Sequence, residues 1–493
     1  MSPLDLAVIG SYLMVTLGLG LWISRRQASS SDYFLGARNL PAWAILLSIV
    51  ATETSALTVI SIPGVGARGD LAFLQITFGY LIGRMAVAWW LLPGYFRGEQ
   101  ETAYARLESR FGGETRRVVS ATFLVTRFLG DGVRIFAGAI PLALATGWSL
   151  SASILVMGLV TLAYTWLGGL KAVIWADVVQ LMVYLSGGVA ALAIAVSMAG
   201  GVEQAWILAA AAGKLRVLVP EFSFSTTYTL VGGLVGGAML SAASHGTDHL
   251  IVQRLLATRS LRDARVALIG SGVMVILQFL LFLLIGVAIW AAGQAPDGVH
   301  PDTLFPAFIM AHLPVGLRGL LIAGILAAAM STISSSINAL ASSVTYDFYA
   351  SRTGRTDPVH LLKVGRLVTV VWGFALTGAA LGFAVASTRL DTPVVVLALS
   401  IASITYGALL GTYLLALRWP RARGRDVVRG VALSVAIMLV VVFARQLAAA
   451  GFPLLGPLGG LAWPWYVPLG TVLTLGVAII SSLTGRGTLE PTP

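Results

Sequence analysis

Hydroxyl groups are concentrated in one apolar segment of the chain. Residues 327–338 read AAAMSTISSSIN, in which five of six consecutive positions from Ser331 are serine or threonine. Ser331, Thr332 and Ser335 share one face at helical spacing. Small residues let helices pack closely, but this density of hydroxyls exceeds what packing needs. Hydroxyl oxygens suit a hard cation such as Na⁺, so ion binding and close helix packing are the two interpretations.

A second polar cluster lies in residues 48–58, which read SIVATETSALT and precede Pro63 and Gly64. Five of the seven residues from Thr52 to Thr58 carry a hydroxyl or carboxyl group, so a continuous lipid-facing helix is not expected there. A helix interrupted inside a membrane frees backbone carbonyls, and these can bind a hard cation. The alternative is a polar helix face packed against a neighbour.

Ionisable side chains occur in further apolar segments. Arg127, Asp131 and Arg134 fall near one helix face at spacings of four and three. An Arg–Asp pair would leave one arginine for a carboxylate-bearing solute, although wholly structural pairing explains the same pattern. Asp177 lies near the end of another apolar segment, where exposure at the membrane surface is the competing explanation.

Two histidines, His245 and His249, stand four residues apart. This spacing can ligate zinc. No glutamate follows the first histidine and no third ligand is evident, so hydrogen bonding or contact with a solute is favoured. An intramembrane zinc hydrolase built on these histidines is kept as an alternative.

The elements that position these residues are predicted to be membrane helices. Of 493 residues, 57% are hydrophobic and 11% are charged, whereas a soluble chain has about 25% charged residues. The mean hydropathy is +0.88. The net charge of +11 is spread over short loops rather than gathered in a patch, which argues against nucleic-acid binding. The absence of cysteine excludes a disulfide framework and cysteine-based metal sites.

Thirteen apolar runs are long enough to cross a membrane as helices. They are residues 4–24, 41–66, 71–96, 117–146, 149–168, 173–199, 228–252, 266–292, 317–348, 365–387, 392–417, 428–448 and 463–484. With the N-terminus outside, the predicted inside loops hold 23 lysines and arginines and the outside loops hold six, as the positive-inside rule requires. We therefore expect an all-α membrane protein with the C-terminus inside, no cleaved signal peptide, and a disordered cytoplasmic tail at 487–493.

Five motifs stand in a characteristic order: 32–38 (DYFLGAR), 104–111 (YARLESRF), 168–180 (GGLKAVIWADVVQ), 253–257 (QRLLA), and Asn338 followed by 347–349 (DFY). In this order they resemble the sodium/solute symporter family, which includes the sodium/glucose, proline, sialic acid, iodide and monocarboxylate carriers. The resemblance covers residues 5 to 440 and is closer to the anion and monocarboxylate branch than to the sugar carriers.

The resemblance implies a LeuT-type fold, in which five helices are repeated in inverted orientation. The first repeat would be 41–199 and the second 228–417, with peripheral helices in 4–24 and 428–484. The family's shared sodium site would consist of the carbonyls of Ala51, Thr54 and Ala328 and the hydroxyls of Ser331 and Thr332. A second sodium ion, present in some members, would bind at Asp177, Ser334 and Ser335.

The solute-facing positions are implied less firmly, because the polar side chains of the sugar carriers are not matched. The resemblance places Glu53, Thr58, Thr77, Ser241 and Ser244 there, and the spacing argument adds Arg134. A carboxylate-bearing solute is therefore favoured over a sugar. Glu53 departs from the anion branch; it would bind an amine, pair with Arg84 or Arg134, or titrate during transport.

Together these features predict a sodium-coupled symporter that imports a small organic solute by alternating access, and not an enzyme. The expected setting is a bacterial inner membrane, with a monomer sufficient for transport, the bilayer and the solute as partners, and one or two Na⁺ as coupling ions. One alternative is a proton-coupled carrier that uses Glu53 or Asp177. Another is a membrane sensor, which the lack of a predicted soluble domain disfavours.

Overall fold

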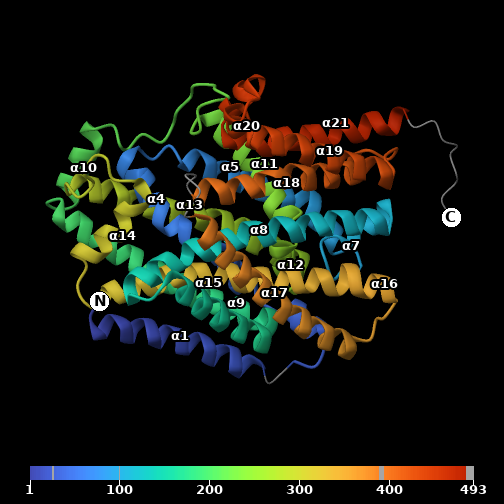
Figure 1. Cartoon of the computed structure of the whole chain (residues 1–493), viewed down its shortest axis with the longest axis horizontal. Coiled ribbons are helices and arrows are strands. Elements are labelled where there is room, and N and C mark those ends of the chain that lie inside the picture. Colours follow the sequence, from blue (N-terminus) through green and yellow to red (C-terminus); the bar gives the residue numbers. More distant parts are fainter. Residues whose placement is uncertain (25–26, 99, 388–393, 485–493) are drawn as a thin grey trace.

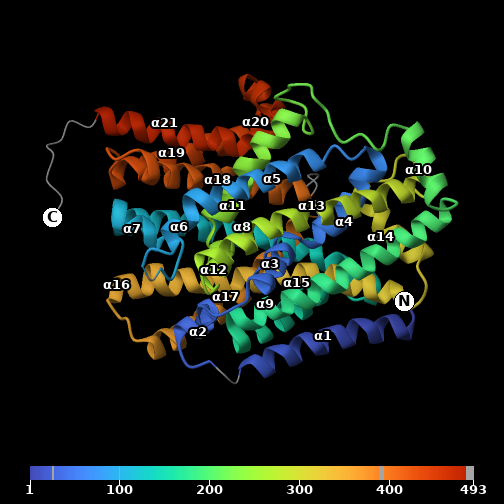
Figure 2. The same ribbon diagram turned by 180° about the vertical axis from the view of Figure 1, so that it is seen from behind.

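The chain folds into a bundle of helices, seen in a computed structural model that describes residues 1–24, 27–98, 100–387 and 394–484 (Figure 1). Within these ranges no strand occurs, and an isolated bridge joins Leu40 to Thr258. The long helices run roughly along the long axis of the molecule. Helix α1 (Pro3–Ser24) lies at one edge, and α19 (Gly424–Val442) and α21 (Tyr466–Thr484) lie at the opposite edge (Figures 1 and 2).

The first half of the chain contains the helices of the first six predicted spans. After α1 they are α2 (Ser30–Leu35), η1 (Gly36–Arg38), α3 (Ala42–Glu53), α4 (Ala56–Arg68), α5 (Leu74–Ala86), η2 (Val87–Leu91), α6 (Leu92–Tyr95), α7 (Ala105–Phe111), α8 (Gly113–Thr146) and α9 (Leu150–Met198). Helix α9 contains two predicted spans, which meet at Gly169. There φ is +54° and ψ is −155°, a conformation open to glycine and costly for other residues.

The second half supplies the remaining helices. They are α10 (Val202–Ala211), η3 (Gly232–Gly236), α11 (Gly237–Gly246), α12 (His249–Leu256), α13 (Leu261–Ala291), α14 (Pro301–His312), α15 (Leu317–Ser343), η4 (Val344–Ala350), α16 (Ser351–Thr353), α17 (Pro358–Ser387), α18 (Val394–Arg418), α19, α20 (Ala444–Ala449), η5 (Pro453–Gly460), η6 (Trp463–Trp465) and α21.

Every one of the thirteen predicted spans contains helix. By length and apolar composition alone, however, eight helices in the described ranges could cross a membrane, or nine if α3 and α4 count as one bent span. One reason for the lower number is that α9, with 49 residues, counts once. Another is that α11 and α12 are each too short to qualify. The count of thirteen and the orientation stay predictions.

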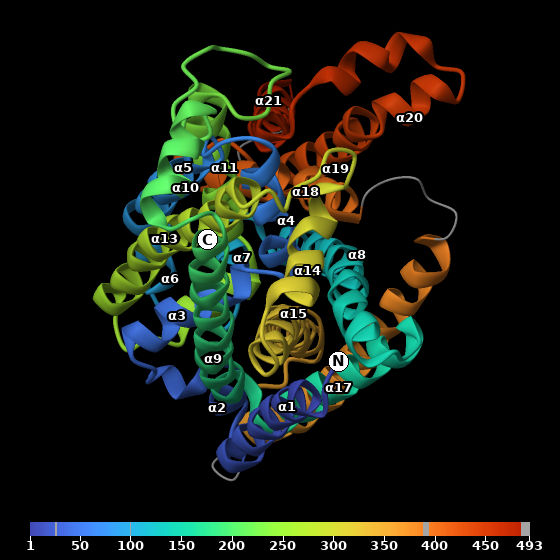
Figure 3. The ribbon, with the colours of Figure 1, turned by 90° about the vertical axis from the view of Figure 1, so that its left-hand side faces the viewer.

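Helix α15 forms the centre of the bundle, as the view along the helices shows (Figure 3). Every residue from Leu321 to Ser343 is buried. Its first turn is capped from another helix: the amides of Gly316 and Gly319 donate to Oδ1 of Asp5 in α1, at 2.7 and 3.0 Å. A side-chain oxygen that accepts from the free amides of a helix start stabilises that helix. The fully buried Asp5 therefore ties α1 to α15.

Two predicted spans are interrupted, one near its middle and the other near its end. Helix α3 ends at Glu53 and α4 begins at Ala56, with a bend of 69° between them. Helix α11 ends at Gly246 and α12 begins at His249. The polar composition of residues 48–58 predicted the first interruption. The second was not predicted, because 228–252 was expected to be one continuous span.

Several basic residues that the loop count placed outside the spans are buried within the bundle. Arg254 is fully buried in α12, and Arg116 in α8 forms an ion pair with Asp347 at 2.8 Å. The ammonium of Lys214 donates to the carbonyls of Ala67 and Gly69 at the end of α4, at 2.7 and 3.0 Å. Burial in the loop between α10 and α11 lowers the pKa of Lys214. Arg25, Arg26, Arg389, Arg486 and the tail 487–493 lie outside the described residues.

Candidate functional site

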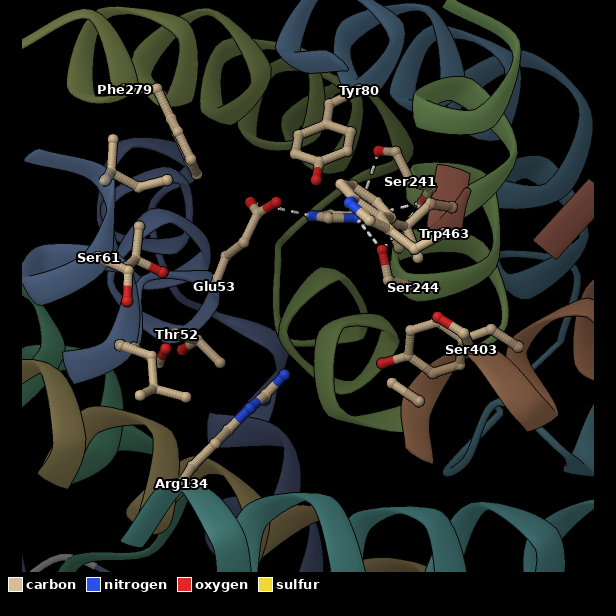
Figure 4. Close-up of a pocket in the computed structure, with 18 of the residues that line it drawn as sticks. Thr52, Glu53, Ser61, Tyr80, Arg134, Ser241, Ser244, Phe279, Ser403 and Trp463 are labelled. Carbon is tan, nitrogen blue, oxygen red and sulfur yellow. Dashed lines mark hydrogen bonds and ion pairs between the residues drawn. The ribbon is translucent and has the colours of Figure 1, made fainter. Parts of the chain in front are cut away.

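The two helix interruptions contribute to one cavity of about 270 Å³ (Figure 4). From α3, α4 and the residues between them, the lining comprises Thr52, Glu53, Ser55, Leu57, Thr58, Ser61, Ile62 and Val65. From α11 and α12 it comprises Leu240, Ser241, Ser244, His245, Leu250 and Ile251. Other parts of the bundle complete it with Phe73, Tyr80, Arg127, Arg134, Tyr228, Phe279, Ala402, Ser403, Tyr406 and Trp463. The cavity is thus polar around the interruptions and aromatic on other sides.

The first interruption frees backbone carbonyls. Thr54 (φ −79°, ψ 106°) and Ser55 (φ −92°, ψ 166°) are extended. The first turn of α4 starts with the amide of Thr58 donating to the carbonyl of Ser55 at 2.9 Å. Consequently the carbonyls of Ala51 and Thr54 accept from no backbone amide among the described residues. A helix end leaves carbonyls in this state, ready to bind another partner.

A hydroxyl group of α15 approaches the last turn of α3, next to the interruption. Thr332 Oγ1 is 3.5 Å from the carbonyl oxygen of Thr52 and 3.2 Å from that of Ala328. Ser331 Oγ donates to Asp177 Oδ1 at 2.6 Å, so its lone pairs stay available to a cation. The five residues of the predicted sodium site are buried. They supply uncharged oxygen atoms alone, a donor set that fits a hard monovalent cation.

Asp177 is buried next to this set of oxygens and accepts hydrogen bonds from several side chains. Its Oδ2 accepts from Ser48 Oγ at 2.5 Å, from Thr52 Oγ1 at 3.3 Å and from Arg254 Nη2 at 3.1 Å. Asp177 and Arg254 are both fully buried. The carboxylate therefore lies inside the bundle, and the competing explanation of exposure at the membrane surface is wrong for Asp177.

Arg254 occupies the neighbourhood predicted for a second sodium ion. Its guanidinium contacts Asp177 and donates to Ser335 Oγ. Ser334, the third residue of that prediction, donates to a carbonyl of its own helix at 3.0 Å. In this conformation, the cation paired with Asp177 is the side chain of Arg254.

Glu53 forms an ion pair with Arg84 and lies 3.5 Å from Nε2 of His245. Arg84 is fully buried and also donates to Ser271 Oγ at 2.7 Å. Of the partners considered from the sequence, the structure thus shows Arg84 and not Arg134. The side chain of Glu53 is still 22% exposed, and its carboxylate points into the cavity (Figure 4).

Arg134 enters the cavity from α8. Its Nη1 lies 3.1 Å from Asp131 Oδ1, and the other oxygen of Asp131 accepts from Ser336. The remaining N–H groups of Arg134 donate to none of the residues that the structure describes. The side chain is 23% exposed and points towards the space below Glu53 (Figure 4).

The second interruption is closed by an ion pair. Arg127 donates to Asp248 Oδ2 through Nη2 at 2.6 Å and Nε at 3.1 Å, and the hydroxyl of Tyr406 donates to the same oxygen at 2.9 Å. Asp248 Oδ1 accepts from the amide of Leu250 at 2.9 Å and so caps α12. Of the two arginines that the sequence analysis singled out in α8, Arg127 is therefore held by this ion pair, whereas Arg134 keeps N–H groups that none of the described residues accepts.

Five of the predicted solute-facing residues line the cavity: Glu53, Thr58, Arg134, Ser241 and Ser244. Thr77 does not belong to the lining. It is fully buried, and its hydroxyl donates to the carbonyl of Leu74 in its own helix at 2.8 Å. One turn further along α5, Tyr80 takes the position at the cavity instead.

The two histidines point to different partners. Nδ1 of His245 lies 2.8 Å from Ser244 Oγ. Nδ1 of His249 accepts from the amide of Ala103 at 3.2 Å, and its Nε2 lies 3.1 Å from Ser342 Oγ. In the described part of the chain, no three His, Cys, Asp or Glu residues come together as a metal site would require. Their contacts are hydrogen bonds within the bundle.

Among the cavity residues that escaped the sequence analysis are Tyr406 in α18 and Trp463 in η6. The segment that carries Trp463 is held over the cavity by the loop before η3: the amide of Ala462 donates to the carbonyl of Phe224 at 2.7 Å, and the Phe224 and Trp465 rings are 4.9 Å apart. Helix α21 was predicted to be peripheral, yet the turn before it contributes to the site. The paired tryptophans in Trp-Pro-Trp at 463–465 were an available signal, since tryptophans gather at membrane interfaces.

Comparison with known proteins identifies the class of molecule to which this cavity belongs. A model of the sodium:solute symporter family matches residues 33–442. The human sodium/iodide cotransporter is 30% identical over 456 residues, which are 90% of this chain and 70% of that protein. The sodium/sialic acid symporter of Proteus mirabilis is 27% identical over 453 residues, 90% of each chain. A sodium-coupled monocarboxylate transporter of Danio rerio is 28% identical over 449 residues, 88% of this chain and 70% of that one.

Solved structures agree with this assignment. A sodium-coupled sialic acid symporter in a substrate-bound, outward-open state superposes with a TM-score of 0.85 and 25% identity, covering 98% of both chains. A nucleobase-cation-symport-1 family transporter superposes with a TM-score of 0.55 and 16% identity, over 93% of this chain and 96% of the other. The second likeness concerns the fold alone.

Proposed function

Because this chain belongs to the sodium:solute symporter family, we propose that it imports a small, carboxylate-bearing organic solute together with Na⁺. Members of the family are sodium-coupled membrane transporters and not enzymes. The observation that carries the choice of solute is Arg134, whose guanidinium points into the cavity with N–H groups to spare. Such a group binds carboxylates well where water is largely excluded. Two relatives are named for acids, sialic acid and monocarboxylates.

The coupling ion is proposed to bind at Ala51, Thr54, Ala328, Ser331 and Thr332. The support is the set of free carbonyls at the α3–α4 interruption and the hydroxyl of Thr332 in α15, which contacts the carbonyls of Thr52 and Ala328. A buried site of neutral oxygens replaces the water shell of a hard cation. Since Thr52 and Ser55 line the cavity, an ion bound here would stabilise the side of the cavity that the solute contacts.

A second ion at Asp177, Ser334 and Ser335 is proposed for a conformation in which Arg254 has withdrawn. In the structure described above, the guanidinium of Arg254 holds Asp177 and Ser335. A sodium ion and this guanidinium would compete for the same carboxylate. Binding of the second ion would therefore be coupled to the position of α12, which carries Arg254.

Transport is proposed to proceed by alternating access. The cavity lining follows α4 from Leu57 to Val65, towards the predicted outer end of that helix, while the Arg127–Asp248 pair and Tyr406 close its inner side. This arrangement fits an outward-facing conformation. Binding of ion and solute would allow the outer side to close and the inner contacts to open, releasing both. We place the protein in a bacterial inner membrane, with the N-terminus outside and a monomer sufficient for transport.

The sodium gradient can supply the free energy. One charge that crosses ~100 mV gains ~2.3 kcal/mol, and a ~tenfold concentration gradient adds ~1.4 kcal/mol. One ion would thus concentrate a neutral or zwitterionic solute roughly 400-fold. For a monoanion, a single ion gives electroneutral transport that the membrane potential does not drive. The charge of the solute therefore decides how much work each ion performs.

A proton-coupled carrier is the competing proposal, with Glu53 or Asp177 as the proton site. Both carboxylates form ion pairs with buried arginines, Glu53 with Arg84 and Asp177 with Arg254. At either carboxylate a proton would have to compete with an arginine of the protein. The sodium site proposed above contains no such cation, and we therefore favour sodium as the coupling ion.

The direct test is a thermal-unfolding screen of the purified protein against organic acids, amino acids and sugars, in sodium or potassium chloride. A ligand that binds the native state raises the unfolding temperature. We expect stabilisation by carboxylate-bearing compounds in sodium alone. Stabilisation that is equal in both salts, or that depends on pH and not on sodium, would replace sodium coupling by the proton-coupled proposal.

A further inference from the structure

We infer that the solute is a zwitterion, whose cationic amine lies against Glu53 and the aromatic side chains near it while its carboxylate binds Arg134. The inference rests on the proposed function, because it names the class of solute for the same cavity. It adds Glu53 and the aromatic side chains near it, which the proposed function does not assign to the solute.

Glu53 presents an acceptor that the protein does not satisfy. Both of its ionic contacts, with Arg84 and with His245, use Oε2. Oε1 accepts from no side chain or amide among the described residues, and the carboxylate points into the cavity (Figure 4). A solute that displaces water from Oε1 and brings no positive or donor group would leave a charged oxygen without a partner, which is costly in a buried site. An amine removes that cost.

Aromatic rings stand on the same side of the cavity as Glu53. Tyr80 and Phe279 flank it in Figure 4. Phe279 stacks on Phe73 with ring centroids 5.0 Å apart, and Phe73 contacts Tyr228 at 5.5 Å. All four rings line the cavity. The faces of aromatic rings attract ammonium groups, most strongly where water is excluded. A hydroxyl or amide could donate to Glu53, but the rings single out a cation.

Arg134 supplies a positive charge, opposite in sign to that of Glu53, on another side of the cavity. It approaches from α8, and Figure 4 places it across the cavity space from Tyr80 and Phe279. The side chains of Glu53 and Arg134 have nearly equal exposure, 22% and 23%. A simple amine would meet the repulsion of Arg134, and a simple acid would meet the unsatisfied oxygen of Glu53. A molecule with both groups satisfies both ends, which is how a site gains specificity against either half.

The experiment compares molecules of one shape that differ by one charge. Trimethylglycine and tert-butylacetate form one matched pair, and γ-aminobutyrate and valerate form another; choline supplies the cation without a carboxylate. Affinity is measured by thermal unfolding of the purified full-length protein in sodium chloride, with potassium chloride as the reference salt. We expect the zwitterion of at least one pair to bind about tenfold more tightly than its partner, and choline to bind weakly.

Variants of the protein then show which residues cause the preference for the zwitterion over the matched acid. Glu53→Gln alone would leave Arg84 buried without its partner and endanger folding, so the primary variant combines it with Arg84→Gln. We expect this double variant to bind both members of a pair equally. Phe279→Leu keeps an apolar side chain without a ring, and we expect it to reduce the preference about threefold. Glu203→Gln, on exposed α10, is the matched control and should keep the full preference.

The outcomes separate this inference from the proposed function. Sodium-dependent binding of the acids that equals or exceeds binding of the zwitterions would overturn the zwitterion and leave a carboxylate symporter. Binding of neither class, with sodium itself still stabilising the protein, would overturn the inference and the choice of a carboxylate together. A zwitterion preference that survives in the double variant would remove Glu53 from the site.

Discussion

The interruption between α3 and α4 and the one between α11 and α12 use the same backbone device in different surroundings. At the first, the carbonyls of Ala51 and Thr54 accept from no backbone amide among the described residues, and a hydroxyl of α15, that of Thr332, lies 3.5 Å from the neighbouring carbonyl of Thr52. At the second, Asp248 caps α12 with one carboxylate oxygen and binds Arg127 and Tyr406 with the other. One interruption presents unpartnered acceptors, and the other contains a cation that belongs to the protein.

This difference separates two tasks that an interrupted helix can perform. Free carbonyls and hydroxyls can exchange water for an ion that enters and leaves, because no fixed charge holds the place. Both members of an Arg–Asp pair belong to the protein, so the ion pair can only stay formed or separate. We therefore interpret the first interruption as the place where the coupling ion binds and the second as a contact that must break when the cavity opens inwards.

The largest effect is expected when the ion pair between Arg127 and Asp248 is broken. Asp248→Asn removes the carboxylate that binds Arg127 through two hydrogen bonds and leaves Asp131, at 3.6 Å, as its remaining ion-pair partner; loss of a buried ion-pair partner typically costs about 3–5 kcal/mol of folding stability. We expect a clear fall in the thermal-unfolding temperature of the purified protein. Combining the change with Arg127→Gln should restore part of the loss. If Asp248→Asn unfolds like the parent protein, the second interruption is not held by this pair.

The next-largest effect is expected at the α3–α4 interruption, where the proposed ion ligands are uncharged. Ser331→Ala with Thr332→Ala removes two oxygen ligands, and we expect the sodium concentration for half-maximal uptake to rise at least ~tenfold, because each lost ligand weakens ion binding. Uptake is measured in proteoliposomes at matched expression. Thr345→Val, at the far end of the same span, removes a hydroxyl bonded to its own helix and is the control. Unchanged sodium dependence in the double variant would move the ion elsewhere.

A smaller effect distinguishes Arg127 from Arg134, the two arginines of α8 that line the cavity. Arg134→Ala should weaken binding of a carboxylate compound about tenfold and of its uncharged amide about twofold or less, because a charge-assisted contact is lost for the acid alone. Thermal shifts in sodium chloride report both affinities. Equal losses for acid and amide would mean that Arg134, like Arg127, has a structural role.

The smallest effect is expected at Trp463, which lines the cavity from the turn before α21. Trp463→Ala should weaken solute binding about threefold through lost apolar contact, while the sodium dependence stays unchanged. Trp463→Phe keeps a ring and serves as its control. A change in sodium dependence equal to that of the Ser331 and Thr332 variant would show that this turn acts on the first interruption and not on the solute alone.

The sequence predicted the first interruption because its polar atoms are dense and local. Five hydroxyl or carboxyl groups between Thr52 and Thr58 have no reason to be in a lipid-facing helix, so the pattern itself indicates a site. The second interruption has a weaker signal. Gly246 lies at a helix end and Asp248 at a helix start, and both residue types are typical of these positions. The surrounding apolar residues nevertheless made the segment look like one continuous span. Helix ends inside a span are missed when the span is read as one unit.

Pairings between distant helices could not be predicted in the same way. Asp177 and Arg254 are 77 positions apart, and the loop count assigned Arg254 to water although it is fully buried. That a side chain is charged does not show whether it lies in a loop or is buried in the bundle. Similarly, Thr77 and Tyr80 are one turn apart on α5, and the packing of the side chains decides which of them reaches the cavity. The sequence left Glu53 to bind an amine, to pair with Arg84 or Arg134, or to titrate, and the structure shows the pair with Arg84.

The contact of Asp5 with α15 has a consequence for how the protein is assembled. Asp5 is synthesised before α15, and the amides of Gly316 and Gly319 that donate to it emerge more than three hundred residues later. A newly inserted α1 therefore carries a carboxylate without these two donors, which disfavours early burial in lipid. Helix α1 can complete its docking only after the central helix has been inserted. Biogenesis would then include a late step that joins α1 to the helix that carries the proposed ion ligands.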